Sequence, residues 1–184
     1  MAGGVARAWV IIMRSPPRKP RKRPSSSKRS FGARSVAYEF WMLWILATFK
    51  VPEDALPPEF TRGAMLESLL LHFRGLREFF KSKSSDADTV LAADFAPRVP
   101  PAWKNIVERE GPRLNKLLSH VSYSRRDLLR NWDHPKIARI VRERFVAFLG
   151  AIPDPERTFF ATAEMKQLLP EVAWSAATAP SLDA

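Results

Sequence analysis

Residues 64–80 read AMLESLLLHFRGLREFF, a stretch in which apolar residues recur at spacings of three and four. This spacing places side chains on one face of an α-helix, because a helix turns by about 100° per residue. The apolar side comprises Met65, Leu69, His72, Leu76 and either Phe79 or Phe80. The opposite side carries Glu67, Arg74, Arg77 and Glu78. We therefore predict an amphipathic helix of about six turns over residues 58–82, packed on a core through its apolar side.

The segment before this helix is apolar nearly all round. Residues 40–49 read FWMLWILATF, about half the length that a bilayer crossing needs. Such a segment is typical of a helix at the centre of a bundle. Ser35 is a suitable N-cap, and Val51 followed by Pro52 stops the helix, which we place at residues 35–50.

Further helices are predicted towards the C-terminus. One starts near residue 102, is interrupted at 111–112, and resumes with a buried side of Leu114, Leu117, Leu118 and Val121. The next has Asp133 as its N-cap and Gly150 as its C-cap. Its buried side comprises Ile137, Ile140, Val141, Phe145 and Phe148. We also expect one helical turn near residues 90–95 in the loop 82–101, and a short helix at about 161–169.

Strand signals are nearly absent, because no alternating run of β-branched residues is joined to another by a hairpin turn. The predicted fold class is all-α, a four- to five-helix bundle with a disordered basic N-terminal tail. A chain of 184 residues suits one such domain with tails. We divide it into a basic leader at 1–34, the bundle at 35–152, and a short helix with a C-terminal tail at 153–184.

The formal net charge of +11 is concentrated near the N-terminus. Residues 1–38 contain ten Lys or Arg and no acidic residue, whereas the rest of the chain contains twenty against nineteen. The run RSPPRKPRKRPSSSKR at 14–29 favours an extended, solvated tail. Its functional interpretation is a nonspecific contact with phosphates or an anionic surface. The alternative is a disordered leader without a role, or an upstream start with Met13 as the true initiator.

Composition excludes several classes of site. The absence of cysteine excludes disulfides and thiolate metal sites, and is consistent with a cytoplasmic location. The three histidines lack metal-ligand spacing, so we expect neither metal nor cofactor. None of the seven glycines falls in a phosphate-binding loop motif, and there is no G-x-S-x-G nucleophile elbow. No stretch is long and apolar enough to indicate a membrane segment.

The candidate catalytic residues lie in RLNKLLSH, at residues 113–120. Arg113 and His120 are two helical turns apart and would project from one face. In RNA cleavage, an imidazole can move the proton of a ribose 2′-hydroxyl or of the leaving oxygen, while a guanidinium holds the phosphate. Asn115, Tyr123 and Arg125 are the candidate substrate-binding residues near the same cleft. The alternative is an ordinary packing helix with one hydrogen-bonded histidine.

Three residues of the 58–82 helix are secondary candidates. His72 lies on the predicted apolar side, so a core or interhelical role is favoured over a chemical one. Glu67 and Arg74 are two turns apart on the polar side, which favours a structural ion pair. His134 precedes Pro135 at a predicted helix start, where capping geometry explains it.

The three stretches 64–80, 88–95 and 113–125 together resemble uncharacterised bacterial proteins of the HEPN superfamily of helical bundles. Their shared pattern is an E-S-x-L-x-H-x-R-x-L-x-x-F-F helix and a later N-K-x-L-x-H-x-x-Y-x-R helix end, and the resemblance covers about residues 36–150. It implies a homodimer that cuts RNA without a metal, through an arginine and a histidine that correspond to Arg113 and His120. It also implies a toxin or defence role, with a cognate antitoxin or operon partner as a candidate. Leu114 departs from the commonest nuclease pattern, in which a polar residue directly follows the arginine.

Two hypotheses follow from the sequence. One is a metal-independent endoribonuclease that uses Arg113 and His120. The other is a noncatalytic helical interaction module whose basic tail gives nonspecific nucleic-acid contact. RNA is the expected substrate of the first, whereas the second implies only nonspecific contact with nucleic acid.

Overall fold

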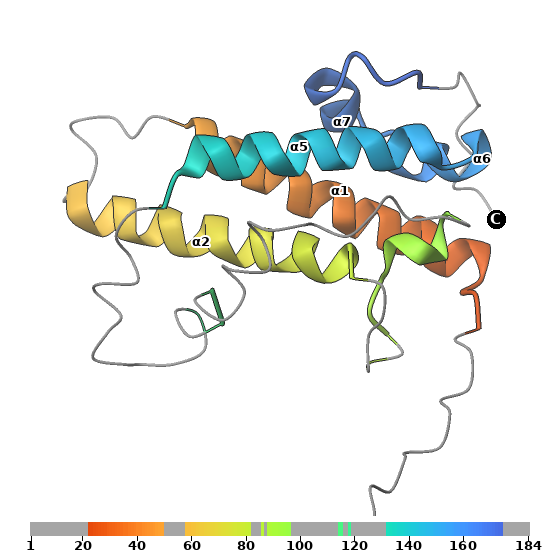
Figure 1. The fold of residues 1–184 in the computed structure, drawn as a ribbon, viewed down its shortest axis with the longest axis horizontal. Helices are drawn as coiled ribbons and strands as arrows, with labels where there is room; N and C mark the ends of the chain where they lie inside the picture. Colours follow the sequence, from red (N-terminus) through yellow and green to blue (C-terminus); the bar gives the residue numbers. More distant parts are fainter. Residues whose placement is uncertain are drawn as a thin grey trace, which may run out of the picture.

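The computed structural model describes residues 22–49, 58–81, 86, 88–96, 114–115, 118 and 132–174. Every regular element in these residues is helical, which confirms the predicted all-α bundle. Three long helices dominate the fold in Figure 1. The elements are α1 (Ser26–Thr48), α2 (Pro58–Phe79), the 3-10 turn η1 (Ala92–Asp94), α5 (His134–Ala151), α6 (Asp154–Arg157), the 3-10 turn η2 (Thr158–Phe160) and α7 (Ala163–Leu168).

Helix α1 is the central element of the bundle. It packs against α2, α5, α7 and η2, and in Figure 1 it lies between α2 and α5. Phe40 and Leu43 are fully buried, whereas Phe49, beyond the last turn, is largely exposed. The prediction that the apolar segment 40–49 lies at the centre of the bundle is therefore confirmed for its first turn.

The predicted start of the first helix at Ser35 was wrong, because α1 begins at Ser26. Its N-cap is Ser25, whose hydroxyl accepts a hydrogen bond from the Lys28 amide (3.4 Å). Ser35 lies inside the helix and donates its hydroxyl to the Phe31 carbonyl (3.3 Å). Residues 22–34 thus belong to the folded unit instead of a leader, because residues distant in the sequence contact them.

Helix α2 buries a face turned slightly from the predicted one. The predicted Leu69, Leu76 and Phe79 are buried, but Met65 and His72 are only half-buried. Phe80, the predicted alternative to Phe79, is buried as well, and so are Leu66, Leu70 and Phe73. Apolar residues flank the predicted stripe on both sides, so contacts with the neighbouring helices decide which side of α2 is buried.

Helix α5 starts as predicted and ends later. Asp133 accepts a hydrogen bond from the Lys136 amide (3.0 Å), which confirms it as the N-cap. The predicted C-cap Gly150 is wrong, because the helix continues to Ala151 and Ile152 is its C-cap. Arg157 stabilises this end, since its guanidinium donates to the carbonyls of Leu149 (2.9 Å) and Ile152 (3.1 Å).

Two short predicted elements are present. The single turn expected near residues 90–95 is η1, and the short helix expected at 161–169 is α7, capped by Thr162. Helix α6 and η2, between α5 and α7, were not predicted. Phe95 and Phe160 bring the segments at η1 and η2 into the core, where their rings lie 5.0 Å apart.

Candidate functional site

Most of the predicted site lies outside the part of the chain that the structure describes. This applies to Arg113, His120, Tyr123 and Arg125. Asn115 is described, and it is helical and exposed. Its neighbour Leu114 is fully buried in the core, and Leu118 packs against the core one turn later. The inward direction predicted for these two leucines is confirmed.

A residue advances by about 100° around a helix axis, so Asn115 lies about 100° to one side of the buried Leu114. This position agrees with the exposure of Asn115.

The described secondary candidate His72 joins two helices. Its Nδ1 lies 2.8 Å from the Oε2 atom of Glu39 in α1, and its ring meets the Tyr38 ring edge-on at 5.9 Å. The side chain of His72 is 14% exposed and that of Glu39 is 34% exposed. The Glu39 carboxylate is within hydrogen-bond distance of Nδ1 of His72, which agrees with the predicted interhelical role. Glu67 and Arg74 are half-buried on the same helix.

A glycine makes room for this contact. A Cβ atom at Gly75 would lie 3.0 Å from the Oε2 atom of Glu39. A larger residue at this position would require the Glu39 side chain to shift by a few tenths of an ångström. The partner of His72 was not predicted, because nothing in the sequence links position 39 to position 72.

A second candidate region is an open groove of about 900 Å³ at the start of α1. One wall consists of residues 22–25 and 27–29 and continues along α1 through Phe31 and Ser35. The facing wall is formed by residues 88–90 together with Asp94 and Phe95. The two walls meet at Gly32, where a Cβ atom would lie 2.9 Å from a methyl group of Val90. Sequence reasoning missed this groove because it assigned its basic wall to a leader.

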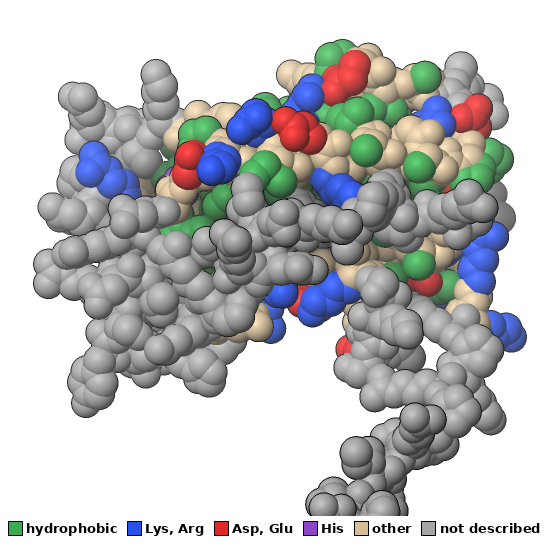
Figure 2. Space-filling model, viewed as in Figure 1, with side chains coloured by type: hydrophobic (Ala, Val, Ile, Leu, Met, Phe, Trp, Pro, Cys, Tyr) green, Lys and Arg blue, Asp and Glu red, His purple; other side chains and the backbone are tan. Residues whose placement is uncertain are grey.

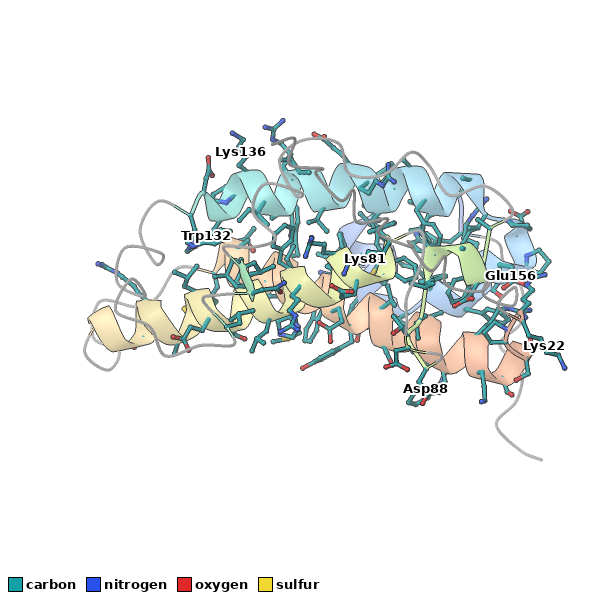
Figure 3. All side chains as sticks on the ribbon, turned by 60° about the horizontal axis from the view of Figure 1, so that its bottom comes forward. Lys22, Lys81, Asp88, Trp132, Lys136 and Glu156 are labelled. Carbon is teal, nitrogen blue, oxygen red and sulfur yellow. The ribbon has the colours of Figure 1, made fainter. Side chains whose placement is uncertain are left out.

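Glu156 of α6 anchors the basic wall. Its Oε1 atom accepts hydrogen bonds from Nη2 of Arg23 (2.9 Å) and Nη2 of Arg29 (3.0 Å), and its Oε2 atom accepts one from Nε of Arg29 (3.1 Å). Arg23 also donates from Nε to the carbonyl of Asp94 (3.2 Å), which ties the two walls together. Figure 3 shows Lys22 and Glu156 at the same end of the bundle, with Asp88 beside the first half of α1.

The charges around the groove are unevenly distributed. Figure 2 shows Lys and Arg side chains at the right edge of the molecule, where α1 begins, and others over α5. The side chains of Lys22 and Lys28 are exposed, and neither has an ion-pair partner among the described residues. On the other wall, the Asp94 carboxylate is buried and accepts the Leu91 amide (2.9 Å). Asp88 is exposed.

Comparison with known proteins gives no relative. No protein-family model matches the chain, and neither the curated proteins nor the solved structures contain a match. Among the described residues, no helix has the length and apolar character to span a bilayer. In the same residues, no three His, Asp or Glu side chains cluster as a metal site would require.

Proposed function

We propose that this chain is a HEPN-like endoribonuclease that needs no metal, with His120 as general acid or base and Arg113 as the phosphate anchor. The observation that supports this best is that Leu114 is buried and Leu118 packs against the core. Seven residues are about two turns, so positions 113 and 120 would share one flank of a regular helix, and a helix that buries 114 and 118 would turn this flank away from the core. That arrangement suits a guanidinium and an imidazole acting on one phosphate.

The proposed enzyme works as a homodimer of a toxin or defence type, with a cognate antitoxin or operon partner. Support for self-association comes from exposed apolar side chains on α1 and α2. Tyr38 (52% exposed) and Ile45 (37%) are two turns apart on one face of α1, and Leu71 (53%) lies on α2. Exposed apolar residues that share a face are typical of an interaction surface.

The dimer has its own test. Tyr38→Glu would place a charge in the proposed interface, so we expect this variant to be monomeric by light scattering and to lose cleavage. Lys136→Glu, on α5, changes charge at an exposed position and serves as the control. A wild-type protein that is monomeric at all concentrations would remove the dimer from the proposal.

The ribonuclease proposal is tested with mixed RNA in the presence of EDTA. We expect the wild type to cleave, and His120→Ala to lose about 100-fold or more in rate, the usual contribution of a general acid or base. Arg113→Ala should also be impaired, because the phosphate loses its anchor. His134→Ala is the matched control, since His134 begins α5 and is not part of the proposed site.

Two results would contradict the proposal. One is undiminished cleavage by a folded His120→Ala variant. The other is the absence of cleavage by a folded wild-type dimer.

A second candidate function is a noncatalytic helical module that binds nucleic acid through its basic N-terminal region. The exposed Lys22 and Lys28, carried on a segment anchored by Glu156, favour this candidate. It predicts that the wild type binds RNA with a strong salt dependence and leaves it intact. His120→Ala would then bind as the wild type does.

A further inference from the structure

We propose that the groove at the start of α1 binds single-stranded RNA, with phosphates along the Lys22–Lys28 wall and a base stacked on Phe31. The choice of RNA over other single-stranded nucleic acid rests on the ribonuclease function proposed above. Binding at the groove does not depend on catalysis. The argument comes from the cations, the aromatic ring and the acidic residues around the groove.

The cations of the basic wall have two different roles. Arg23 and Arg29 are engaged by Glu156, and the side chain of Arg29 is only 13% exposed. Lys22 and Lys28, each next in sequence to one of these arginines, remain exposed. Their ammonium groups can contact phosphate oxygens. Because Glu156 already holds the wall that carries them, binding would cost little backbone conformational entropy.

Phe31 supplies the aromatic surface. It is 77% exposed although it lies in the second turn of a helix whose other face is buried, and it lines the groove with the lysines. An exposed ring beside cations is the arrangement on which bases of a single strand stack while their phosphates contact basic side chains. Every base has a flat face, so such binding is tolerant of sequence.

The facing wall limits where phosphates can run. The exposed carboxylate of Asp88 repels them, which confines them to the α1 side. The buried Asp94 carboxylate is engaged by the Leu91 amide. Carboxylates accept hydrogen bonds from base amino groups, as Asp and Glu do from cytosine. A strand in the groove therefore has its phosphates towards Lys22 and Lys28 and its bases towards Phe31 and Asp88.

The ring also distinguishes single strands from duplexes. The bases of a duplex are stacked on one another and cannot stack on a side chain without leaving the helix. Lysine contacts alone would bind either form. The contribution of Phe31 should therefore appear with single strands only.

The test measures fluorescence anisotropy with a labelled single-stranded RNA and a duplex of the same sequence, over a series of salt concentrations. All proteins carry His120→Ala, so that the RNA stays intact. We expect Phe31→Ala to weaken single-strand binding by between about 5-fold and about 100-fold, the usual effect of removing one stacking ring. Its salt dependence should match that of the parent, and duplex binding should not change.

The lysines should act differently from the ring. Lys22→Gln and Lys28→Gln should each weaken binding and lower the slope of log affinity against log salt by about 0.7, the value for one phosphate contact to a single strand. Phe49→Ala removes an exposed ring at the other end of α1, and Lys136→Gln removes an exposed lysine at the start of α5. Both should bind as the parent does. Figure 3 places Lys136 at the opposite end of the bundle from Lys22.

Three outcomes would overturn the groove assignment. In the first, Phe31→Ala binds single strands as tightly as its parent, so that the affinity belongs to other basic residues. In the second, Phe31→Ala weakens duplex binding equally. In the third, an acidic peptide or anionic vesicles displace the RNA at a lower concentration than competing RNA does, and Phe31→Ala weakens their binding. This result would assign the groove to a different partner.

The two proposals can fail separately. If the wild type cuts no RNA but binding depends on Phe31 and the lysines, the ribonuclease proposal fails and the groove stands. If the wild type cuts RNA and Phe31→Ala changes neither binding nor cleavage, the groove proposal fails and the nuclease stands.

Discussion

At the scale of single residues, Glu156 links the N-terminal region to the C-terminal part of the chain. Its side chain is 11% exposed and meets two guanidiniums, one of them through both oxygens. A two-point contact between Arg29 and a carboxylate is among the stronger polar interactions in proteins. This single residue thus holds the first turn of α1 against the C-terminal part of the chain.

We expect Glu156→Gln to lower the free energy of unfolding by about 3 kcal/mol, because it leaves the Arg29 charge largely buried without a counter-charge. Urea unfolding measures this change. The control is Glu143→Gln, which breaks an exposed pair with Arg139 (3.5 Å) and should cost less than about 0.5 kcal/mol. Equal effects of the two substitutions would show that the contact to Glu156 contributes no more than a surface pair.

His134 should give the protein a measurable pH dependence. Burial lowers the pKa of this histidine below its usual 6.5, against the opposing effect of Asp133. The unfolded chain therefore takes up a proton at a higher pH than the folded chain. Stability from this residue is fully present above pH 6.5 and is lost as the pH falls through the folded pKa.

The measurement compares the wild type with His134→Asn by urea unfolding between about pH 5 and about pH 8. Carboxylates titrate in both proteins, so their effect cancels in the difference. The stability of the variant relative to the wild type should rise as the pH falls below 6.5. A difference that is constant with pH would contradict the prediction.

At the scale of elements, the helices contain glycines with opposite surroundings. A Cβ atom at Gly63, inside α2, would meet no atom within 4 Å. At Gly32, inside α1, it would meet Val90 at 2.9 Å, on a β-branched side chain with little freedom to move. Gly63 lowers the stability of α2, whereas Gly32 allows α1 to approach the segment before η1.

Gly63→Ala should therefore raise the free energy of unfolding by about 0.5–1 kcal/mol, the usual gain in an open helix interior. Gly32→Ala should bring no net gain, because overpacking against Val90 costs about 1–3 kcal/mol. Thermal and urea unfolding of both variants check the pair. A similar gain from each would mean that Val90 moves aside freely.

At the scale of the whole molecule, one cluster of phenylalanines joins α2, the segment at η1, α5 and η2. Phe79, Phe80, Phe95, Phe145 and Phe160 each lie within 6.5 Å of another ring of the cluster, and most pairs are edge-to-face. Phe148 of α5 contacts all five, at 5.2–6.4 Å between ring centroids. These rings belong to the one hydrophobic core of the described residues.

Phe148→Ala should cost about 3–5 kcal/mol, since it removes a fully buried ring and leaves a cavity between several helices. The exposed Phe31 is the control, and its replacement by Ala should change stability by less than about 0.5 kcal/mol. Urea unfolding followed by circular dichroism measures both. A small cost at Phe148 would indicate that the core collapses around the missing ring.

Local patterns predicted much of the fold and less of the candidate site. Asp133 acts as a cap through atoms of its own turn, so sequence spacing was enough to find it. The start of α1 could not be predicted, because a basic, proline-rich run favours solvation until Glu156, far along the chain, neutralises its arginines. The partner of His72 could not be predicted either, because Glu39 is 33 residues away in the chain.

By itself, the sequence determined that this protein is an all-α bundle, because helical periodicity and end signals act within one or two turns. It also singled out Arg113 and His120, which stay a prediction. Tertiary structure alone decided that part of the basic segment is folded, that Phe31 faces a groove with two lysines, and which side of α2 is buried. Each of these depends on contacts between residues distant in the chain, whose energies no local pattern contains.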